Sequence, residues 1–158
     1  MPQSATILFV CLGNICRSPL AEGALKARAD AAGLDLMVDS AGTGDWHVGR
    51  APDERAQAVA RANGVDISGY RARQVAAADF QRFTHIFALD HTNLADLRAL
   101  APSGATAEVA LLLDAVDGQQ GQAVADPYYG TAEDFETTWA EVDAAAQALV
   151  TLLARDLR

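Results

Sequence analysis

Two cysteines and an arginine lie within seven residues of one another near the N-terminus, as Cys11, Cys16 and Arg17. A thiol beside backbone amides and a guanidinium is expected to have a lowered pKa and to be a thiolate, which is a strong nucleophile. The arginine guanidinium can hold two oxygens of a phosphate group in a bidentate fork. Ser18 can donate its hydroxyl to the thiolate and ease its later departure. These residue types predict attack by Cys11 on a phosphate ester.

The flanking residues predict that this cluster lies in a loop between a strand and a helix. Residues 6–10 read as a buried strand, Pro19 suits the first position of a helix, and Ser18 suits the cap before it. Such a loop directs its backbone N–H groups and the positive end of the helix toward one point, where a dianionic phosphate would bind. Gly13 permits close backbone approach, and Asn14 tolerates the left-handed conformation that a tight loop requires.

The full run from Cys11 to Pro19, Cys-Leu-Gly-Asn-Ile-Cys-Arg-Ser-Pro, is much more specific than a cysteine and an arginine alone. In its strand–loop–helix context it resembles the signature of the low-molecular-weight protein tyrosine phosphatases, and the resemblance covers nearly the whole chain. The alternative is a buried cysteine in a glycine-containing turn. The resemblance implies hydrolysis of phosphotyrosine in proteins, and of small aryl phosphates, through a phosphocysteine intermediate and without a cofactor. The residues that bind phosphate or another oxyanion would be Leu12, Gly13, Asn14, Ile15, Cys16 and Ser18, beside the catalytic Cys11 and Arg17.

A thiolate that attacks phosphate also needs a proton donor for the leaving oxygen, and later a base for the attacking water. Asp126, followed by Pro127, Tyr128 and Tyr129, looks like the general-acid loop of this family. An ordinary Asp-Pro turn is the alternative. Tyr128 and Tyr129 would form one wall of a cleft for an aromatic ring, and Trp46 matches the family position of the opposing wall. Each could instead be a partly buried surface aromatic.

Three further positions match residues that support the loop in relatives. Ser40 matches a serine that hydrogen-bonds to the loop asparagine, here Asn14, although it could be an ordinary serine at a strand end. Asp90 matches an acid expected to buttress Arg17, and it could equally be a helix cap. Tyr70 stands where many relatives carry a histidine, before the run Arg-Ala-Arg-Gln at 71–74. The supporting network is therefore expected to be wired differently, with activity retained.

Cys16 is not needed for the displacement itself. It could be a small packing residue, but a second thiol beside a thiolate favours a redox-sensitive pair. In relatives with this spacing the pair is known to form a disulfide under oxidation, and the resemblance implies the same here.

Three rival functions remain open. Arsenate reduction on a similar fold uses additional cysteines further along the chain, and none follows Cys16. Phosphoarginine phosphatases of the same family tend to carry threonine at the position of Ile15, whose apolar side chain favours an aryl phosphate. A non-catalytic phosphotyrosine-binding module would be expected to lack the nucleophile, the arginine or the acid, and all three are present.

Composition limits the class of protein. The 158 residues suggest a single phosphatase domain over 1–158, and the net charge of −9 without a basic patch argues against nucleic acid as a partner. The longest apolar run is too short to span a membrane. Two cysteines in one loop and an N-terminus without a signal-type segment predict a cytoplasmic protein. No metal site is expected from the two cysteines and the scattered His47, His85 and His91. A monomer or weak dimer is expected.

Alternating strands and helices predict an α/β fold, a doubly wound parallel sheet with helices on both faces. The strands are expected at 5–10, 34–40, 83–89 and 109–113, in the order 2-1-3-4. That order puts the Cys11 loop at the topological switch point, where such folds bind ligands. Helices are expected at 19–32, at 52–63, near 93–100, and in a long C-terminal segment that Thr131 caps and that Arg155 and Arg158 follow with positive charge.

Overall fold

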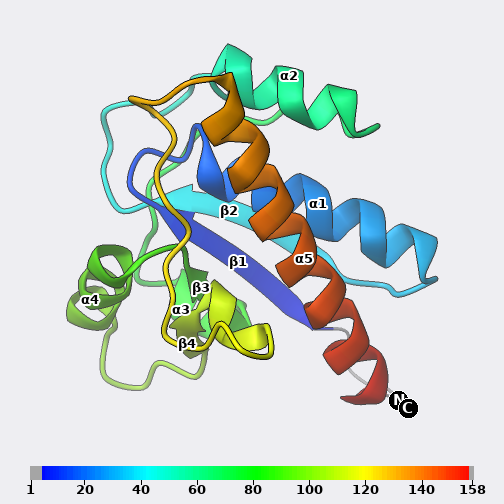
Figure 1. Ribbon diagram of the computed structural model, residues 1–158. Helices are drawn as coiled ribbons and strands as arrows, with labels where there is room; N and C mark the ends of the chain where they lie inside the picture. Colours follow the sequence, from blue (N-terminus) through cyan, green and yellow to red (C-terminus); the bar gives the residue numbers. More distant parts are fainter. Residues whose placement is uncertain (1–4, 157–158) are drawn as a thin grey trace.

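The computed structural model describes residues 5–156 and is built on a four-stranded parallel sheet. Its strands lie in the order β2-β1-β3-β4, which confirms the predicted order (Figure 1). Their bounds are β1 Thr6–Cys11, β2 Met37–Gly42, β3 His85–Ala88 and β4 Glu108–Leu111. The chain reverses its direction of travel across the sheet after β2, so the carboxyl end of β1 lies at the switch point between β1 and β3, as predicted.

Helices cover both faces of the sheet, as the sequence predicts (Figure 1). One face carries α1, α2 and α5, and the other carries α3 and α4. The helical bounds are α1 Arg17–Ala31, α2 Glu54–Ala62, α3 Asp79–Arg82, α4 His91–Leu100, the 3-10 turn η1 Leu112–Ala115, and α5 Ala132–Asp156. No helix within residues 5–156 is both long enough and apolar enough to cross a membrane.

The apolar character of β1 follows from burial on both sides. Ile7 and Phe9 face the core beneath α1 and α5, whereas Leu8 and Val10 face the core beneath α3 and α4. Successive side chains of a strand point to opposite faces, so a strand covered on both faces is apolar at every position. The two cores hold β1 rigidly, and Cys11 ends this strand in the same core as Phe9.

Several boundaries differ from the predicted ones. The second strand begins at Met37 rather than at 34, because Gly33 adopts φ +70° and the Leu34 N–H bonds back to the carbonyl of Ala29, which closes α1. Helix α2 begins at Glu54 rather than at residue 52, since Asp53 is the cap and its carboxylate accepts from the N–H of Arg55.

Four further predictions concern the C-terminal third of the chain. The fourth strand ends at Leu111, and the backbone then turns into η1. At the start of α5 the Thr131 N–H donates to the carboxylate of Asp134, 2.7 Å away. The start of this helix is thus closed by the side chain of Asp134 and not by the Thr131 hydroxyl that the sequence predicts. Arg155 lies in the last turn, as predicted, whereas Arg158 lies outside the described residues.

Candidate active site

Residues 11–18, called the phosphate loop below, join β1 to α1 and turn through one unusual backbone conformation. Asn14 has φ 58°, and no other non-glycine residue in the described part of the chain has a positive φ. Asparagine tolerates this left-handed conformation better than most residues. The chain can therefore curl on itself within a few residues of Cys11, as the sequence predicts.

The helix that follows begins earlier than the sequence predicts. It starts at Arg17 with Cys16 at the cap, so Ser18 is not the cap and Pro19 is the third helical residue. Pro19 costs no hydrogen bond there, because the first four N–H groups of a helix have no partner within it. The hydroxyl of Ser18 is instead engaged with the loop, 3.0 Å from the Cys11 sulfur and 2.8 Å from the amide nitrogen of Asn14.

Cys11 is buried at the floor of the site, with 3% of its surface exposed. Its carbonyl accepts from the N–H of Thr43, and that of Leu12 accepts from Gly44, so the segment after β2 holds the first residues of the loop. A side chain at Gly42 would place its Cβ 2.8 Å from the carbonyl oxygen of Leu12. Glycine is therefore required at this close approach.

The side chain of Asn14 connects three parts of the chain. Its Nδ2 donates to Ser18 at 2.8 Å and to Ser40 at 2.9 Å, and its Oδ1 accepts from the N–H of Arg73 at 3.0 Å. The bond to Ser40 is the one predicted from the sequence. Since Asn14 is 3% exposed, these bonds are shielded from water and fix the left-handed turn.

The network continues into α1 through a buried carboxylate. Ser40 donates to Glu22 at 2.6 Å, and Lys26 donates to the other oxygen of Glu22 at 2.6 Å. Burial raises the pKa of Glu22, while the hydrogen bonds from Lys26 and Ser40 act in the opposite direction. Tyr70, which stands at the histidine position of many relatives, lies with its ring 4.7 Å from the Lys26 ammonium. In this chain the network therefore ends on Glu22 and Lys26.

Arg17 is buried, and two hydrogen bonds fix its guanidinium. Its Nη1 donates to Asp90 at 2.7 Å and to the carbonyl of Val124 at 3.0 Å. The other oxygen of Asp90 accepts from the N–H of Asn93 and caps α4. Asp90 therefore fills both roles considered from the sequence, and it fixes the guanidinium at the base of the cleft.

Residues 126–130, called the acid loop below, lie across the cleft from Cys11. An Oδ2 atom of Asp126 lies 3.7 Å from Nη2 of Arg17, and its Oδ1 accepts from the N–H of Tyr128 at 3.1 Å. The N–H of Gly130 donates to the carbonyl of Pro127. The segment is thus a turn, as the alternative interpretation has it, and the turn points the Asp126 carboxylate toward Arg17.

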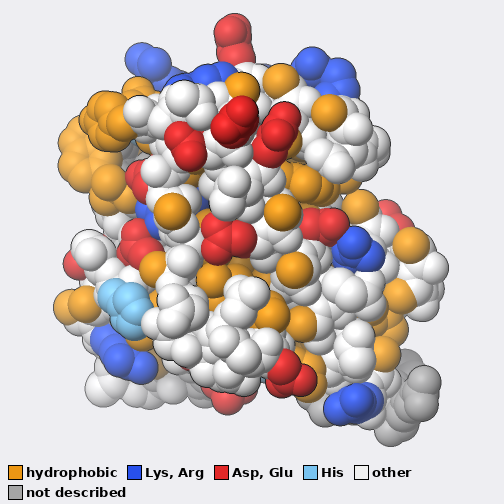
Figure 2. Space-filling model, in the orientation of Figure 1, with side chains coloured by type: hydrophobic (Ala, Val, Ile, Leu, Met, Phe, Trp, Pro, Cys, Tyr) orange, Lys and Arg blue, Asp and Glu red, His pale blue; other side chains and the backbone are white. Residues whose placement is uncertain are grey.

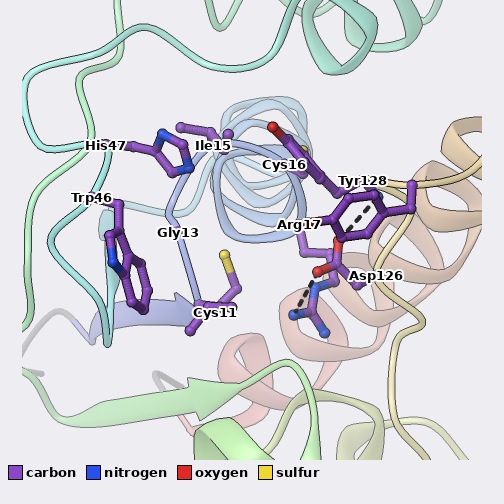
Figure 3. A pocket seen from close by; sticks show the side chains of 11 residues that line it. Cys11, Gly13, Ile15, Cys16, Arg17, Trp46, His47, Asp126 and Tyr128 are labelled. Carbon is purple, nitrogen blue, oxygen red and sulfur yellow. Dashed lines mark hydrogen bonds and ion pairs between the residues drawn. The ribbon is translucent and has the colours of Figure 1, made fainter.

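Between the two loops lies a cleft of about 310 Å³ with Cys11 at its floor. Figure 3 shows Trp46 and Tyr128 on opposite sides of the Cys11 sulfur, the positions expected of two walls. Tyr129 also lines the cleft but is 96% exposed, and its ring makes a T-shaped contact with that of Tyr128. In Figure 2 hydrophobic side chains gather at the upper left, where the segment that precedes α5 passes in Figure 1. The opening therefore suits a flat apolar group attached to an anion.

Residues 6–158 of the chain match the family model for "low molecular weight phosphotyrosine protein phosphatase". The chain belongs to this family. A protein of Schizosaccharomyces pombe with the same family name is 41% identical over 138 residues, which cover 85% of this chain and 88% of that protein.

Solved structures of the phosphatase family superpose closely on this chain. The protein tyrosine phosphatase of Entamoeba histolytica has a TM-score of 0.90 at 33% identity, covering 96% of this chain and 98% of that one. A Drosophila protein described as an arginine phosphatase has a TM-score of 0.86 at 32% identity, covering 92% and 96%. The fold is therefore that of the family, and the fold alone does not choose between these two substrates.

Cys16, the second thiol of this phosphatase, is a free cysteine with 4% of its surface exposed. Burial raises the pKa of the Cys16 thiol, and the nearby Asp53 acts in the same direction. Cys16 is therefore a protonated thiol at neutral pH, unlike the thiolate that the reaction requires. Cys11 is the nucleophile that the geometry favours.

The sequence did not indicate four residues that the site uses. Glu22 and Arg73 complete the Asn14 network, the ring of His47 lines the cleft beside Gly13, and Arg55 contacts the acid loop. Arg73 belongs to the run at 71–74 that the resemblance drew attention to. His47 and Arg55 lie far from the motif in sequence, whereas Glu22 lies one helical turn beyond it, and no local pattern marks any of the three. No cluster of three or more potential metal ligands occurs among residues 5–156.

Proposed function

We propose that this phosphatase hydrolyses phosphotyrosine in proteins, and small aryl phosphates, through a phosphocysteine intermediate. The observation that carries the proposal is the placement of Cys11, Arg17 and Asp126 around one cleft, between the aromatic side chains of Trp46 and Tyr128. A thiolate, a fixed guanidinium and a carboxyl group are the three parts that a cysteine-dependent displacement at phosphorus requires.

In the first step the Cys11 sulfur attacks phosphorus, and the bond from phosphorus to the phenolic oxygen breaks. Arg17, already held through Nη1 by Asp90 and Val124, turns Nη2, which lies 3.7 Å from the Asp126 carboxylate, toward the anion, and the backbone N–H groups of the phosphate loop bind the remaining oxygens. Asp126, as the carboxylic acid, gives its proton to the departing phenolate. The products of this step are the free phenol and phosphocysteine.

In the second step a water molecule attacks phosphorus from the side that the phenol has left. The Asp126 carboxylate accepts the proton of that water, and the sulfur–phosphorus bond breaks. Ser18, whose hydroxyl lies 3.0 Å from the Cys11 sulfur, donates to the departing thiolate. Inorganic phosphate leaves, and Asp126 is again protonated for the next turnover.

The shape of the cleft supports an aryl substrate over phosphoarginine. Ile15, Trp46 and Tyr128 give it apolar sides, and a phenyl ring gains about 0.5–1.5 kcal/mol from contact with aromatic side chains. Phosphoarginine carries a polar guanidinium next to its phosphorus, and these apolar side chains would leave the N–H groups of that guanidinium without hydrogen-bond partners. Arsenate reduction lacks the additional cysteines, since the chain has only 2.

The proposal is tested by the steady-state turnover of four candidate substrates by the purified protein, three of them hydrolysed and the fourth, arsenate, reduced. A phosphotyrosyl peptide, the matched phosphoseryl peptide, phosphoarginine and arsenate with a thiol reductant are compared. We expect kcat/KM for the phosphotyrosyl peptide to exceed the other three by at least tenfold. A preference for phosphoarginine, or binding of the phosphotyrosyl peptide without release of phosphate, would contradict the proposal.

Four finer properties belong to the same proposal: one phosphatase domain over 1–158, activity in the cytoplasm, reversible oxidation of Cys11 with Cys16, and a monomer or weak dimer. The first three are supported by the family match over residues 6–158 and by two free thiols in one loop. Sedimentation of the protein over a range of concentrations tests the fourth.

A further inference from the structure

The start of α2 contacts both loops of the site without lining the cleft between them. The N–H of Asp53 donates to the carbonyl of Ile15 in the phosphate loop at 2.8 Å. The Asp53 carboxylate accepts two hydrogen bonds from the guanidinium of Arg55, from Nε at 3.0 Å and from Nη2 at 3.1 Å. Asp53 therefore ties Arg55 to the loop that carries Cys11.

The guanidinium of Arg55 reaches on to the acid loop. Its Nη2 donates to the carbonyl of Tyr128 at 2.9 Å, and its Nη1 lies 3.4 Å from the carbonyl of Gly130. The same guanidinium lies 4.6 Å from the ring centre of Phe135 and 5.7 Å from that of Tyr128. One planar group thus joins a carboxylate, two backbone carbonyls and two aromatic faces, which an arginine can do and a lysine cannot.

These contacts bear directly on Asp126. Its carboxylate accepts from the N–H of Tyr128, and Arg55 donates to the carbonyl of the same residue. Arg55 therefore holds the backbone of the residue that orients the acid. The acid loop is otherwise exposed: the side chain of Asp126 is 44% exposed, and Tyr129 is 96% exposed. An exposed turn of this kind moves unless something fixes its backbone.

We propose that Arg55 is a positioning residue that fixes the acid loop against the phosphate loop and so sets the distance from the Asp126 carboxyl to the leaving oxygen. The proposal rests on the function proposed above. Partial burial of Asp53 opposes its ionisation, but the hydrogen bonds from Arg55 outweigh that effect and lower the pKa of Asp53. The pair therefore stays charged over the pH range in which the enzyme would act.

The test compares Arg55→Gln with Arg61→Gln, which lies further along the same helix with an exposed side chain and serves as the matched control. For each variant kcat/KM is measured with phenyl phosphate, whose leaving group needs protonation, and with p-nitrophenyl phosphate, whose leaving group needs little. Misplacing a catalytic group by about 1 Å costs about 100-fold in rate. We expect Arg55→Gln to lower kcat/KM by about 10- to 100-fold for phenyl phosphate and by less than about threefold for p-nitrophenyl phosphate, with Arg61→Gln unchanged.

The decisive measurement repeats Arg55→Gln in the Asp126→Ala background. If Arg55 acts through Asp126, its substitution lowers kcat/KM for phenyl phosphate by less than about twofold once the acid is absent, because coupled residues are not additive. Arg55→Lys, which retains the charge without the planar fork, should resemble Arg55→Gln. Thermal unfolding of every variant identifies any that is unfolded at the assay temperature, and Asp53→Asn, which weakens the same contact from its other side, then replaces it.

Three results would overturn the proposal. Equal losses with the two substrates would show that Arg55 does not act on leaving-group protonation. Losses that multiply with those of Asp126→Ala would show that the two residues act separately. Weaker binding of inorganic phosphate to Arg55→Gln, measured as product inhibition, would assign Arg55 to substrate binding. A wild-type protein that hydrolyses neither substrate would instead refute the proposed function, so the two failures are distinguishable.

Discussion

Asn14 is the residue at which the structure makes its most quantitative prediction. It is 3% exposed, has φ 58°, and makes hydrogen bonds to Ser18, Ser40 and the Arg73 N–H. Asn14→Gly removes the three bonds and keeps the left-handed backbone free of strain. At about 1 kcal/mol net for each hydrogen bond, we expect it to lower the free energy of unfolding by about 3 kcal/mol.

Asn14→Ala separates the backbone from the side chain. It loses the same three bonds and, unlike the glycine variant, keeps a Cβ in the left-handed region, which costs roughly 1–2 kcal/mol for a residue without asparagine's tolerance of that conformation. The glycine variant carries some entropic cost of its own, so we expect the alanine variant to be less stable than the glycine variant by about 1 kcal/mol. Urea unfolding followed by tryptophan fluorescence measures both values.

Asn63→Ala is the control for this pair. Asn63 is an exposed asparagine at the end of α2 with one bond to the carbonyl of Val59, and its replacement should cost about 1 kcal/mol or less. Both Asn14 variants should also lose kcat/KM under conditions in which they are folded, because the loop that binds phosphate is no longer fixed. A loss below about 1 kcal/mol in Asn14→Gly would refute the view that this network holds the loop.

The remaining predictions concern the acid, the cleft, the second thiol and a buried carboxylate. Asp126→Ala should lower kcat about 10²- to 10⁴-fold, with a smaller loss for good leaving groups, as steady-state kinetics will measure. Trp46→Ala should lower kcat/KM for aryl phosphates more than for small alkyl phosphates, by a ratio that corresponds to about 0.5–1.5 kcal/mol of lost binding to the aryl ring. Cys16→Ser should keep basal activity but should not recover with thiol after peroxide, because Cys11 oxidises further to the sulfinic acid. Burial raises the pKa of Glu22 above its ordinary 4.5, so folding favours its protonated form; wild type should gain stability relative to Glu22→Gln as pH falls through that raised pKa in urea titrations.

Each of these predictions has a result that contradicts it. Equal losses for all aryl phosphates would show that Asp126 is not the proton donor. Equal losses for aryl and alkyl substrates would place Trp46 outside the cleft in solution. Full recovery of the Cys16→Ser variant would leave Cys16 a packing residue only. A stability difference between wild type and Glu22→Gln that widens in favour of the variant as the pH falls would reverse the sign of the Glu22 effect.

The sequence predicts the parts of this protein that are local. Cys11, Asn14 and Arg17 lie within one short loop, and the alternation of strands with helices leads to the strand order with few alternatives. Residues brought in by the fold were predicted only where a family resemblance pointed to them, as for Ser40 and Asp90. The positions of both in the network are visible only in three dimensions.

Residues that act through other residues were missed for a physical reason. Glu22 lies one helical turn beyond the motif and reads as an exposed helix acid, yet the fold buries it against Ser40 and Lys26. Arg55 reads as a solvent-exposed residue of α2, and its contacts with the acid loop span 73 positions of sequence. Element boundaries also shifted by a few residues, since caps such as Asp53 depend on neighbouring backbone that a sequence pattern does not show.

The central claim is that Cys11 forms a covalent bond with phosphorus, and trapping that intermediate tests it most directly. Asp126→Ala is mixed with p-nitrophenyl phosphate, whose leaving group departs without protonation, while hydrolysis of the phosphoenzyme lacks its base. The mixture is quenched with denaturant during turnover and examined by intact-mass measurement, peptide mapping and phosphorus NMR. We expect one phosphoryl group per chain, attached to the Cys11 sulfur and absent from Cys11→Ser. Release of p-nitrophenol without phosphorylated protein, or a phosphoryl group on any other residue, would contradict the claim.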